Sequence, residues 1–424
     1  MDLTIEKLVY GGDGLAHHDN STVFVPFVLP AERVSVAVIE QHKKFVRARV
    51  ERLIEAAPER ATARCPHYGV CGGCHYQHIP YPAQLQFKTE ILRETLGRLG
   101  RIDWSGDIAI HPSPPWGYRN RAQWKIRALN DLSSRGLGIG YFRANSTILC
   151  PVEECAILSP LLVKTLVALR SALSEKAIPS ELREIEVFAG GNDTQLLLTA
   201  KFAGFPRRRQ QLADTFRRVV PEIQSLLFHD ASSGRMELDG PGYVKSEVAG
   251  FDYRVGHLSF FQVNRFLVSE LARQVLEGAG GGQLALDLFA GVGLFSLPLA
   301  LRFKRVVAVE SNPEAARDLE SNASGQRGIE IRNVDVERFL EKCRETPDLV
   351  VLDPPRVGVP RQVISHLARI APGAITYVSC EPPTLARDLV ELRRVGYEIS
   401  QIHLFDLFPE TFHIESVVCL GRPS

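Results

Sequence analysis

The stretch LALDLFAGVGLFSLPLA, residues 284–300, decides the fold of the C-terminal part of this chain. An apolar run ends at Asp287, a tight turn with Gly291 and Gly293 follows, and a second apolar run continues with the spacing of a helix. Glycines at such a turn let a ligand approach the backbone at a helix N-terminus. The stretch therefore predicts the first strand, turn and helix of a parallel α/β sheet that binds a nucleoside cofactor.

Further strand-like runs follow, and three of them end in an acidic residue. Glu310 ends the next strand, where a carboxylate can accept hydrogen bonds from ribose hydroxyls. Asp335 ends the third run and is placed either to cap the following helix or to face the base. Asp353 ends the fourth run and begins the tetrapeptide Asp-Pro-Pro-Arg. These positions predict a cofactor site along one edge of the sheet.

The choice of cofactor depends on what surrounds the glycine turn. The six-residue G-x-G-x-x-G spacing of dinucleotide-binding domains is absent, because position 296 is serine. Together with the Asp-Pro-Pro sequence, this favours S-adenosylmethionine over NAD. An aromatic residue after the second proline would suggest methylation of an exocyclic amine, whereas Arg356 stands there. We therefore expect a carbon atom as the methyl acceptor.

Length and composition limit the remaining possibilities. A chain of 424 residues predicts two or three domains, and 45% hydrophobic with 23% charged residues is typical of soluble globular proteins. The N-terminus lacks a signal-peptide pattern, and the apolar stretch 284–303 is interrupted by Asp287, so we expect a cytoplasmic protein without a membrane span. The net charge is only +1, so binding to a polyanion would require local clusters of positive residues.

The stretch VSCEPPTLARDL, residues 378–389, places Cys380 where a strand ends and a helix begins. A packed cysteine is the commoner interpretation of such a position. A nucleophile is the alternative: C5 of uracil becomes reactive when a thiolate adds to C6, and a carboxylate must later remove the C5 proton. Glu415, at the start of an apolar strand, is the candidate for that base.

At these positions the sequence resembles the RNA (uracil-5-)-methyltransferase family, the S-adenosylmethionine-dependent 5-methyluridine enzymes of rRNA and tRNA. The matching stretches are SFFQVN (259–264), DLFAGVGLF (287–295), VES (309–311), LDPPR (352–356), VSCEPPTLARDL and HIESV (413–417). The resemblance implies that Cys380 is the nucleophile, Glu415 the base and Asp353 a residue at both cofactor and uracil. The cofactor contacts that it implies are Gln262, Phe289, Gly291, Leu294, Glu310, Asp335 and Asp353. Glu381 departs from the family pattern, which usually has asparagine there, and its carboxylate should raise the pKa of the Cys380 thiol.

Three cysteines lie close together in RCPHYGVCGGCHYQH, residues 64–78. Their cluster indicates a metal site in a reducing compartment, with a fourth ligand from elsewhere. Zinc with a histidine (His67, His75 or His78) and an iron–sulfur cluster both fit the spacing. The resemblance extends to this stretch and implies a [4Fe–4S] cluster with a structural or RNA-positioning role. Its ligands would be Cys65, Cys71, Cys74 and Cys155, with Cys150 as the alternative fourth cysteine.

Positive residues alternate in YRNRAQWKIRAL, residues 118–129. A strand would place Arg119, Arg121, Lys125 and Arg127 on one face, suited to phosphate, and Trp124 and Ile126 on the other. A solvated face is the commoner meaning of such alternation. Residues 43–52 and 206–211 add further positive charge.

The expected architecture is a multidomain α/β protein with three parts. Residues 1–57 resemble a TRAM domain, an OB-like RNA-binding β-barrel; residues 58–256 form an α/β domain with the iron–sulfur cluster; residues 257–424 form a Rossmann-like methyltransferase domain. A helix at 83–99 packs on its own domain or on the C-terminal one.

The expected function is S-adenosylmethionine-dependent methylation of a uridine at C5 in RNA, most simply 23S rRNA, by a monomer. The alternatives are a tRNA uridine methyltransferase, a non-catalytic RNA-binding protein with a vestigial methyltransferase fold, and a small-molecule methyltransferase. An RNA cytosine-C5 enzyme fits less well, because those enzymes carry a cysteine where this chain has Asp-Pro-Pro-Arg.

Overall fold

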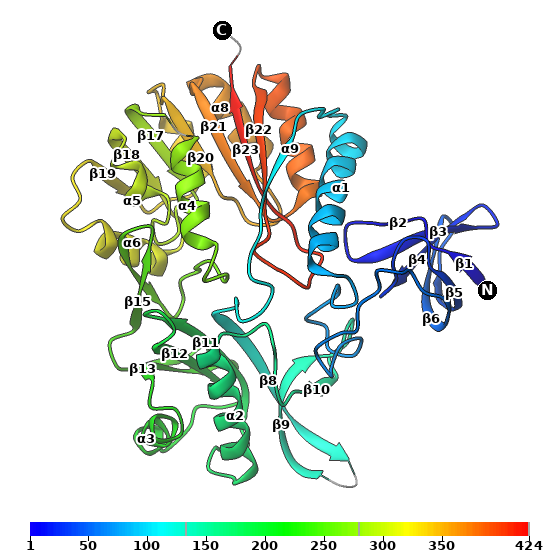
Figure 1. The fold of residues 1–424 in the computed structure, drawn as a ribbon. Coiled ribbons are helices and arrows are strands. Elements are labelled where there is room, and N and C mark those ends of the chain that lie inside the picture. The colour runs from blue at the N-terminus through cyan, green and yellow to red at the C-terminus, as the bar shows by residue number, and fades with distance from the viewer. Residues whose placement is uncertain (132–133, 279, 423–424) are drawn as a thin grey trace.

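The computed structural model describes residues 1–131, 134–278 and 280–422. The described strands form an N-terminal sheet, a central sheet, a two-stranded hairpin and a C-terminal sheet. Figure 1 shows the C-terminal sheet and its helices at the top, the central sheet below, and the N-terminal sheet to one side, next to helix α1.

The N-terminal sheet has the strand order β1-β5-β6-β4-β3-β2. The strands are β1 (Asp2–Thr4), β2 (Lys7–Leu8), β3 (Asp13–His18), β4 (Ser21–Pro26), β5 (Arg33–Gln41) and β6 (Phe45–Glu55). Alternating apolar residues such as Val34, Val36, Val23 and Val25 form its core, as period-two patterning requires. The β-strands predicted for residues 1–57 are confirmed, and closure of this sheet into an OB-like barrel stays a prediction.

The central sheet has the order β10-β9-β8-β11-β12-β13-β14 and carries helices α2 (Pro160–Ser174) and α3 (Arg209–Val219). Its strands are β8 (Arg121–Asp131), β9 (Ser134–Phe142), β10 (Leu149–Pro151), β11 (Leu182–Gly190), β12 (Gln195–Phe202), β13 (Ile223–Asp230) and β14 (Met236–Asp239). The hairpin of β15 (Tyr243–Val248) and β16 (Phe251–Gly256) follows. Trp124 and Ile126 are fully buried in the core of this sheet, as their alternation with charged residues predicts.

The C-terminal sheet has the order β19-β18-β17-β20-β21-β23-β22-β7. Strands β17 to β21 run parallel in this sheet, and β23 lies antiparallel to both β21 and β22. The strands are β7 (Ile108–His111), β17 (Gly282–Leu288), β18 (Phe303–Val309), β19 (Ile329–Arg332), β20 (Leu349–Leu352), β21 (Ala374–Ser379), β22 (Glu398–Phe405) and β23 (Glu415–Gly421). The parallel α/β fold expected from residues 284–300 is confirmed.

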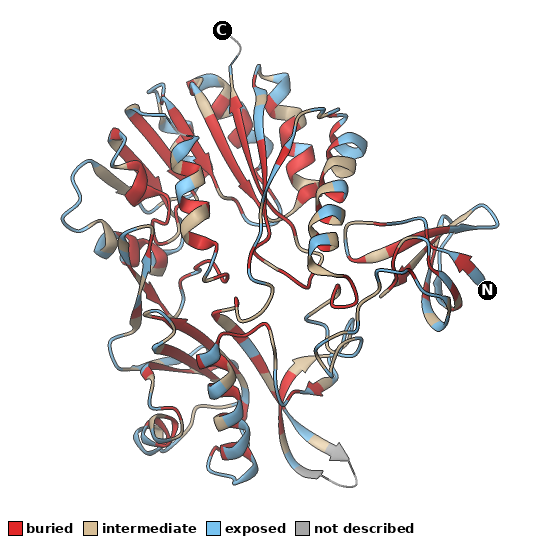
Figure 2. Ribbon diagram, viewed as in Figure 1, coloured by how far each residue is buried: buried red, intermediate tan, exposed pale blue. Residues whose placement is uncertain are grey.

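Helices cover both faces of this sheet, and Figure 2 shows its strands buried between them. On β17, Leu286 packs in one apolar cluster and Ala285 in another, because successive side chains point to opposite faces. One face carries α4 (Val268–Glu277), α5 (Ser296–Leu299) and α6 (Pro313–Ala323). The other carries α1 (Tyr81–Gly100), α7 (Val336–Lys342), α8 (Arg361–Ile370) and α9 (Pro382–Arg394).

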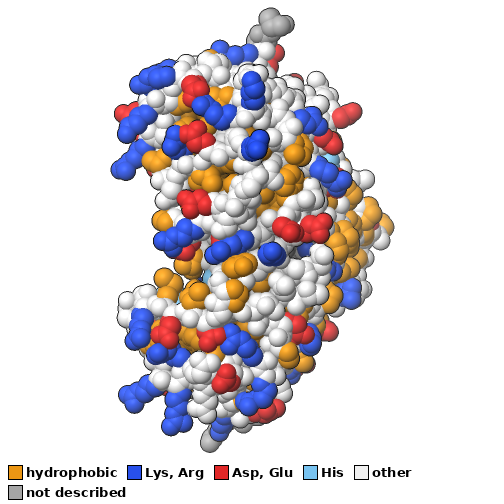
Figure 3. Space-filling model, turned by 90° about the vertical axis from the view of Figure 1, so that its left-hand side faces the viewer, with side chains coloured by type: hydrophobic (Ala, Val, Ile, Leu, Met, Phe, Trp, Pro, Cys, Tyr) orange, Lys and Arg blue, Asp and Glu red, His pale blue; other side chains and the backbone are white. Residues whose placement is uncertain are grey.

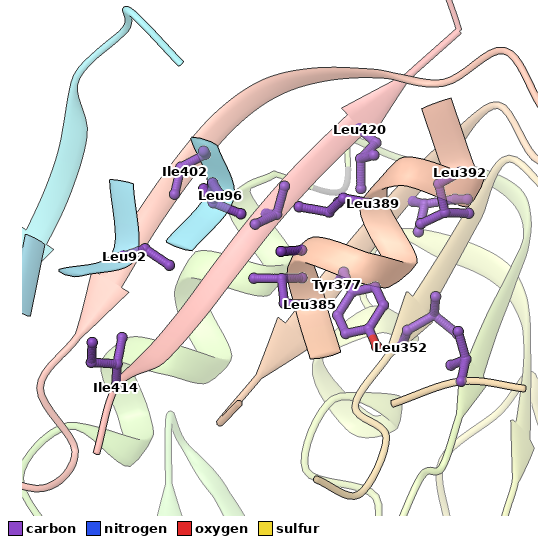
Figure 4. Close-up of a cluster of buried hydrophobic side chains, with 14 of the residues drawn as sticks. Leu92, Leu96, Leu352, Tyr377, Leu385, Leu389, Leu392, Ile402, Ile414 and Leu420 are labelled. Atoms are coloured by element: carbon purple, nitrogen blue, oxygen red, sulfur yellow. The ribbon is translucent and has the colours of Figure 1, made fainter. Parts of the chain in front are cut away.

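Helix α1 and strand β7 belong to this C-terminal layer, although they precede the central sheet in the chain. Leu92 and Leu96 of α1 lie in the same buried cluster as Leu385 and Leu389 of α9 (Figure 4). Strand β7 pairs in parallel with β22 at the edge of the sheet. Lys88 of α1 forms a fully buried ion pair with Asp406, 2.6 Å between Nζ and Oδ1. The helix expected at 83–99 thus packs on the C-terminal sheet.

Among the described residues, the helices are too short or too polar to cross a membrane.

Candidate active site

The carboxyl edge of the C-terminal sheet gathers the acidic residues that the sequence places at strand ends. Asp287 is completely buried at the end of β17, where its Oδ2 accepts a hydrogen bond from the Ser296 hydroxyl. Its Oδ1 is buried without a hydrogen-bond partner. Asp353 follows β20, the strand paired with β17. Burial, with smaller effects from neighbouring acids, raises the pKa of both carboxyls to about 7.

The glycine turn after β17 has the backbone that its sequence predicts. Phe289, Gly291 and Gly293 have φ angles of 67°, 56° and 92°, in the left-handed region that favours glycine. A Cβ added at Gly293 would lie 2.4 Å from the Leu319 side chain, so only glycine fits there. The Gly291 N–H donates to Glu310 Oε2 at 2.8 Å, which joins the turn to the end of β18.

The other predicted cofactor contacts lie around this turn in different environments. Glu310 is half-buried and also accepts from the Asn312 N–H. Asp335 is exposed and caps α7, accepting from the Glu337 N–H at 2.9 Å, so its capping role is realised. Gln262 and Leu294 are buried.

This edge suits a cationic nucleoside. The unpartnered oxygen of Asp287 and the raised pKa values of Asp287 and Asp353 show that the two carboxyls lack a compensating charge. A ligand with a positive centre would stabilise both carboxylates. S-adenosylmethionine carries such a centre, and the Glu310 carboxylate at the end of the next strand is of the type that binds ribose hydroxyls.

The predicted nucleophile and base lie side by side at the same edge. Ser379 of β21 is paired with Ser416 of β23 in an antiparallel register, so the neighbouring residues Cys380 and Glu415 lie at the same end of the two strands. Burial raises the pKa of the Cys380 thiol to about 12, and the Glu415 and Asp353 carboxylates act in the same direction. The effect of Glu381 has the sign expected from the sequence, but it is smaller than those two.

Glu415 is only 3% exposed. Burial and the nearby Asp353 carboxylate raise its pKa well above the ordinary value, and the Arg356 guanidinium opposes this shift. Arg356 also lowers the pKa of Cys380. It is therefore the cation that faces both the thiol and the carboxyl.

Hydrogen bonds join the loop that carries Arg356 to helix α9. The Asp388 carboxylate accepts from the Val359 N–H at 2.9 Å and from the Tyr377 hydroxyl at 2.7 Å. The Thr384 hydroxyl donates to the Arg356 carbonyl at 3.1 Å. Sequence reasoning missed these supports; the i, i+4 spacing of Thr384 and Asp388 on α9 would have been the signal for them.

The four candidate ligand cysteines line one cavity of about 130 Å³ between the segment 65–77 and the central sheet. These are Cys65, Cys71, Cys74 and Cys155. Cys150 instead lies in the hydrophobic core of the central sheet. Across the part of the chain that the structure describes, no group of three or more His, Cys, Asp or Glu residues is arranged to hold a metal ion.

Protein donors face the sulfurs of this cavity. The Gly73 N–H points to Cys71, the Ile157 N–H and the Tyr141 hydroxyl point to Cys155, and the Gln77 side chain points to Cys74. Burial raises the pKa of Cys71 to about 12 and raises those of Cys74 and Cys155. Thiolates with N–H donors are what a cubane cluster requires, so the donor set fits chemically.

The histidines of this segment differ in their partners. His78 bonds to the Tyr68 hydroxyl and the Val28 carbonyl and is therefore occupied. His67 lines the cysteine cavity, and its buried Nε2 has no hydrogen-bond partner.

The positive residues predicted to bind RNA lie on and before β8. Arg119 precedes the strand and lines the cysteine cavity. Arg121 and Lys125 pair with Glu186 and Glu184 of β11, the neighbouring strand. Arg127 is exposed and donates to carbonyl oxygens. Two of the four charges are thus already balanced by acids that lie far away in the sequence.

Positive charge is distributed rather than concentrated on the face drawn in Figure 3. Lysine and arginine side chains occur over both the upper and the lower part of that face, with acidic side chains among them. This agrees with the net charge of +1.

The sequence matches known families along nearly its whole length. The sequence profile described as tRNA (Uracil-5-)-methyltransferase matches residues 80–423, and the TRAM domain profile matches residues 1–50. The chain belongs to the tRNA (uracil-5-)-methyltransferase family. It is an S-adenosylmethionine-dependent RNA (uracil-5-)-methyltransferase with an N-terminal TRAM domain.

Relatives within the family match along their whole length. The 23S rRNA (uracil(1939)-C(5))-methyltransferase RlmD of Klebsiella pneumoniae is 33% identical over 429 residues, covering 100% of this chain and 96% of the relative. An uncharacterized RNA methyltransferase of Aquifex aeolicus is also 33% identical, over 99% of this chain and 98% of its own. The crystal structure of Pyrococcus abyssi tRNA (uracil-54, C5)-methyltransferase with S-adenosyl-L-homocysteine superposes with a TM-score of 0.78 at 26% identity, covering 99% of this chain and 100% of that one.

Proposed function

We propose that this enzyme methylates C5 of a uridine in 23S rRNA through a covalent adduct between Cys380 and C6 of the base, with Glu415 removing the C5 proton. One observation carries the proposal. The thiol and the carboxyl lie together at the carboxyl edge of the sheet, next to Asp353 and the glycine turn. A cysteine that only packs in the core would not require Glu415 and Arg356 beside it.

The residues around the glycine turn would hold the cofactor. Asp287 and Asp353 would stabilise its positive centre, and Glu310 would bind its ribose. The remaining proposed contacts are Phe289, Gly291, Leu294, Gln262 and Asp335. When bound, S-adenosylmethionine supplies a methyl group on a positively charged sulfur.

Cys380 acts first. Its Sγ forms a bond to C6 of uracil, and the electron pair of the C5–C6 double bond moves onto C5 and the C4 carbonyl as an enolate. The thiol must lose its proton for this step, and the Arg356 guanidinium favours that loss by lowering the pKa of Cys380. The enolate carbon C5 would then form a bond to the methyl group as the bond between that group and its sulfur breaks, which leaves S-adenosylhomocysteine.

Glu415 acts last. After methylation, C5 carries both the methyl group and its original hydrogen. The Glu415 carboxylate takes this proton, the C5–C6 double bond forms again, and the C6–S bond breaks to release the Cys380 thiolate. Arg356 supports this step too, because it lowers the pKa of Glu415 against the effect of burial.

The test uses variants of the two residues. Cys380→Ala should abolish methylation while binding of S-adenosylmethionine and RNA is retained. Glu415→Gln should allow addition and methylation but not release, so the RNA should remain attached to the protein as a slow band on a denaturing gel.

Controls separate this mechanism from others. The band should require S-adenosylmethionine and should be missing in the double variant Cys380→Ala, Glu415→Gln. Normal turnover by Glu415→Gln would mean that another group is the base. Methylation by Cys380→Ala would refute the adduct.

We further propose that Cys65, Cys71, Cys74 and Cys155 hold a [4Fe–4S] cluster with a structural or RNA-positioning role. The shared cavity and the donors that face the sulfurs support this assignment. The proposed reaction transfers no electrons, so no step depends on the cluster.

Two RNA substrates have support. The RlmD relatives, which match along their full length, favour 23S rRNA at the position equivalent to uracil 1939. The Pyrococcus abyssi neighbour favours tRNA as the second candidate. Mapping 5-methyluridine in 23S rRNA and tRNA from a deletion strain decides between them. We also propose that the enzyme acts as a cytoplasmic monomer. The residues proposed to contact the RNA are Arg119, Arg121, Lys125 and Arg127.

A further inference from the structure

The loop between β22 and β23, residues 406–414, leads directly into Glu415. Strand pairing holds Glu415 from one side, because it is the first residue of β23 and is paired with Phe405 of β22. On the other side, its position depends on the loop. Ile414, the preceding residue, lies in the same buried cluster as Leu92 of α1 (Figure 4). The shape of the loop therefore bears on where the proposed base lies.

Glu410 of this loop has an unfavourable backbone conformation. It is 3% exposed, and its φ of 66° lies in the left-handed region that residues other than glycine rarely adopt. Such a conformation persists only where the surrounding structure holds it. The Glu410 carbonyl accepts hydrogen bonds from the N–H groups of His75 and Tyr76, at 2.9 and 3.0 Å. These residues directly follow Cys74, so the cysteine segment holds one side of the turn at Glu410.

Gln84 of α1 holds the other side of this turn. Its side chain is fully buried, and its Oε1 accepts from the Glu410 N–H at 3.0 Å. Its Nε2 donates to the carbonyls of Tyr76 and Ile79, at 3.2 and 2.9 Å. A glutamine amide has one oxygen acceptor and two N–H donors, so these three bonds use both ends of the group. One side chain thus ties the turn to α1 and to the cysteine segment.

A second side chain of α1 supports the same loop. Lys88 lies four residues after Gln84 in the helix, so the two side chains are neighbours on one face. The Lys88 Nζ donates to the Phe408 carbonyl at 3.0 Å, in addition to its ion pair with Asp406. Two buried polar side chains of α1 therefore hold the loop before the base.

The chain between the turn and the base is also packed. The Phe412 ring lies edge-on to the rings of His75 and Tyr10, with 4.7 and 5.8 Å between centroids. Tyr10 belongs to the TRAM domain, in the turn between β2 and β3. The Nδ1 of His413 lies 3.5 Å from a guanidinium nitrogen of Arg356. A displaced turn would therefore displace the residues directly before the base as well.

We propose that Gln84 is a positioning residue for the removal of the C5 proton. It holds Glu410 in the left-handed conformation, and the loop in that shape places the Glu415 carboxylate at the edge of the sheet. The inference rests on the proposed function in one respect, that Glu415 is the base. It also connects the cysteine segment to the base, because His75 and Tyr76 hold the same turn.

The test separates methyl transfer from proton removal in single turnovers of the full-length enzyme. The substrate is the transcript, 23S rRNA or tRNA, that the wild type methylates, made with tritium at C5 of its uridines. Labelled S-adenosylmethionine reports methyl transfer, and tritium released to water reports proton removal. In Gln84→Met, methyl transfer should keep its rate and tritium release should be about tenfold slower, because a small misplacement of a reacting group is costly. Methylated RNA should then accumulate on the protein as a slow band on a denaturing gel.

Thr95→Val is the matched control on the same helix, because the Thr95 hydroxyl donates to the Ile91 carbonyl within α1. Both signals should match those of the wild type. A smaller folded fraction of Gln84→Met would reduce both of its signals by the same factor. A parallel loss of the two signals, or no loss in either, would therefore overturn the inference.

A second variant shows whether the effect passes through the turn. Glycine adopts a φ of 66° without steric cost, so the turn no longer depends on the Gln84 bond when Glu410→Gly is added to Gln84→Met. Tritium release should then recover by about threefold or more over Gln84→Met alone, since the backbone again favours the turn. Without such recovery, Gln84 would not act through the conformation of Glu410, and the proposal would be wrong.

Failure of the proposed function has a different signature. If Glu415→Gln releases tritium at the wild-type rate, Glu415 is not the base. If Glu415→Gln traps the RNA while Gln84→Met releases it normally, the base stands and only the positioning role of Gln84 is refuted.

Discussion

The carboxyl edge of the C-terminal sheet and the β8–β11 pair of the central sheet both bury ionisable groups, with opposite results. At the edge, burial prevails and raises the pKa values of Asp353 and Glu415. On the central sheet, burial acts on Glu184 as well, but hydrogen bonds from Lys125 and Lys201 more than offset it and lower the pKa of that carboxyl. On the β8–β11 pair the buried acid Glu184 has its own lysines, whereas the buried acids at the edge lack sufficient positive charge.

This difference distinguishes buried acids that serve the fold from buried acids that serve ligand binding. A buried acid that already has its lysine gains little from a ligand. A buried acid without a sufficient partner is destabilising in the free protein and is stabilised when a cation arrives. Ligand binding should therefore change the pKa values of the carboxyls at this edge, Asp353 and Glu415, more than those of other groups.

The cysteine cavity is an exception to this difference. It borders the central sheet, yet burial raises the pKa values of its thiols. Cys155→Ser should remove the proposed [4Fe–4S] cluster, since a cubane requires four ligands. Anaerobically purified wild-type protein should be brown with about four irons per chain, and the variant should be colourless. Iron analysis and visible absorption measure both.

Cys150→Ser is the matched control for the cluster. Cys150 lies in the hydrophobic core, outside the cavity that the other four share, so its variant should keep the iron. Loss of iron from Cys150→Ser with retention in Cys155→Ser would reverse the choice of the fourth ligand. Stoichiometric zinc without colour in the wild type would exclude the cluster.

Arg356→Gln tests how far a positive charge controls the pKa values of the groups at the edge. Arg356 lowers the pKa values of Cys380 and Glu415, so its loss should raise both. The reactive forms are the thiolate and the carboxylate, and their fractions at a given pH should fall. The rising limb of the rate–pH profile should therefore move to higher pH. A displacement of the limb by about one pH unit corresponds to about tenfold slower methylation at neutral pH.

Single-turnover methylation across a pH series measures this effect. Arg361→Gln, an exposed arginine at the first turn of α8, is the control and should leave the profile in place. A uniform loss of rate in Arg356→Gln, without displacement of the profile, would assign that residue to RNA binding instead.

The smallest expected effect concerns the cations of β8. It distinguishes a cation that is paired with an acid from one that is not. Arg127 donates to neutral carbonyl oxygens, whereas Lys125 pairs with Glu184. If Arg127 meets a phosphate, Arg127→Ala should flatten the slope of log K against log salt by about 0.7–0.9. Lys125→Ala should change the slope less, because its charge is already compensated. Equal slopes in wild type and both variants would mean that this face does not contact RNA.

Sequence reasoning went furthest where chemistry and backbone are local. The turn at Gly291 and Gly293, the acid at the end of each strand and the place of Cys380 after β21 follow from residues close together in the chain. The family assignment came from the same short stretches and is confirmed by the full-length matches.

What the sequence did not disclose depends on distant partners. Glu184 and Glu186 neutralise Lys125 and Arg121 from a strand that begins 51 residues after β8 ends, and no local pattern predicts that pairing. The contact between the rings of Tyr10 and Phe412 likewise joins opposite ends of the chain. The place of β7 in the C-terminal sheet was not expected either, because the strand is short.

The buried pair of Lys88 and Asp406, whose partners are 318 residues apart, has a consequence during synthesis. At translation rates of about 5–20 residues per second, roughly 15–60 s pass between the appearance of the two residues. For most of that interval α1 has no α9 to cover its Leu92 and Leu96, and β7 has no β22 beside it. The nascent chain must therefore carry a helix with an uncovered apolar face until its last helix and strands emerge, and this segment is the part of the chain most exposed to aggregation during synthesis.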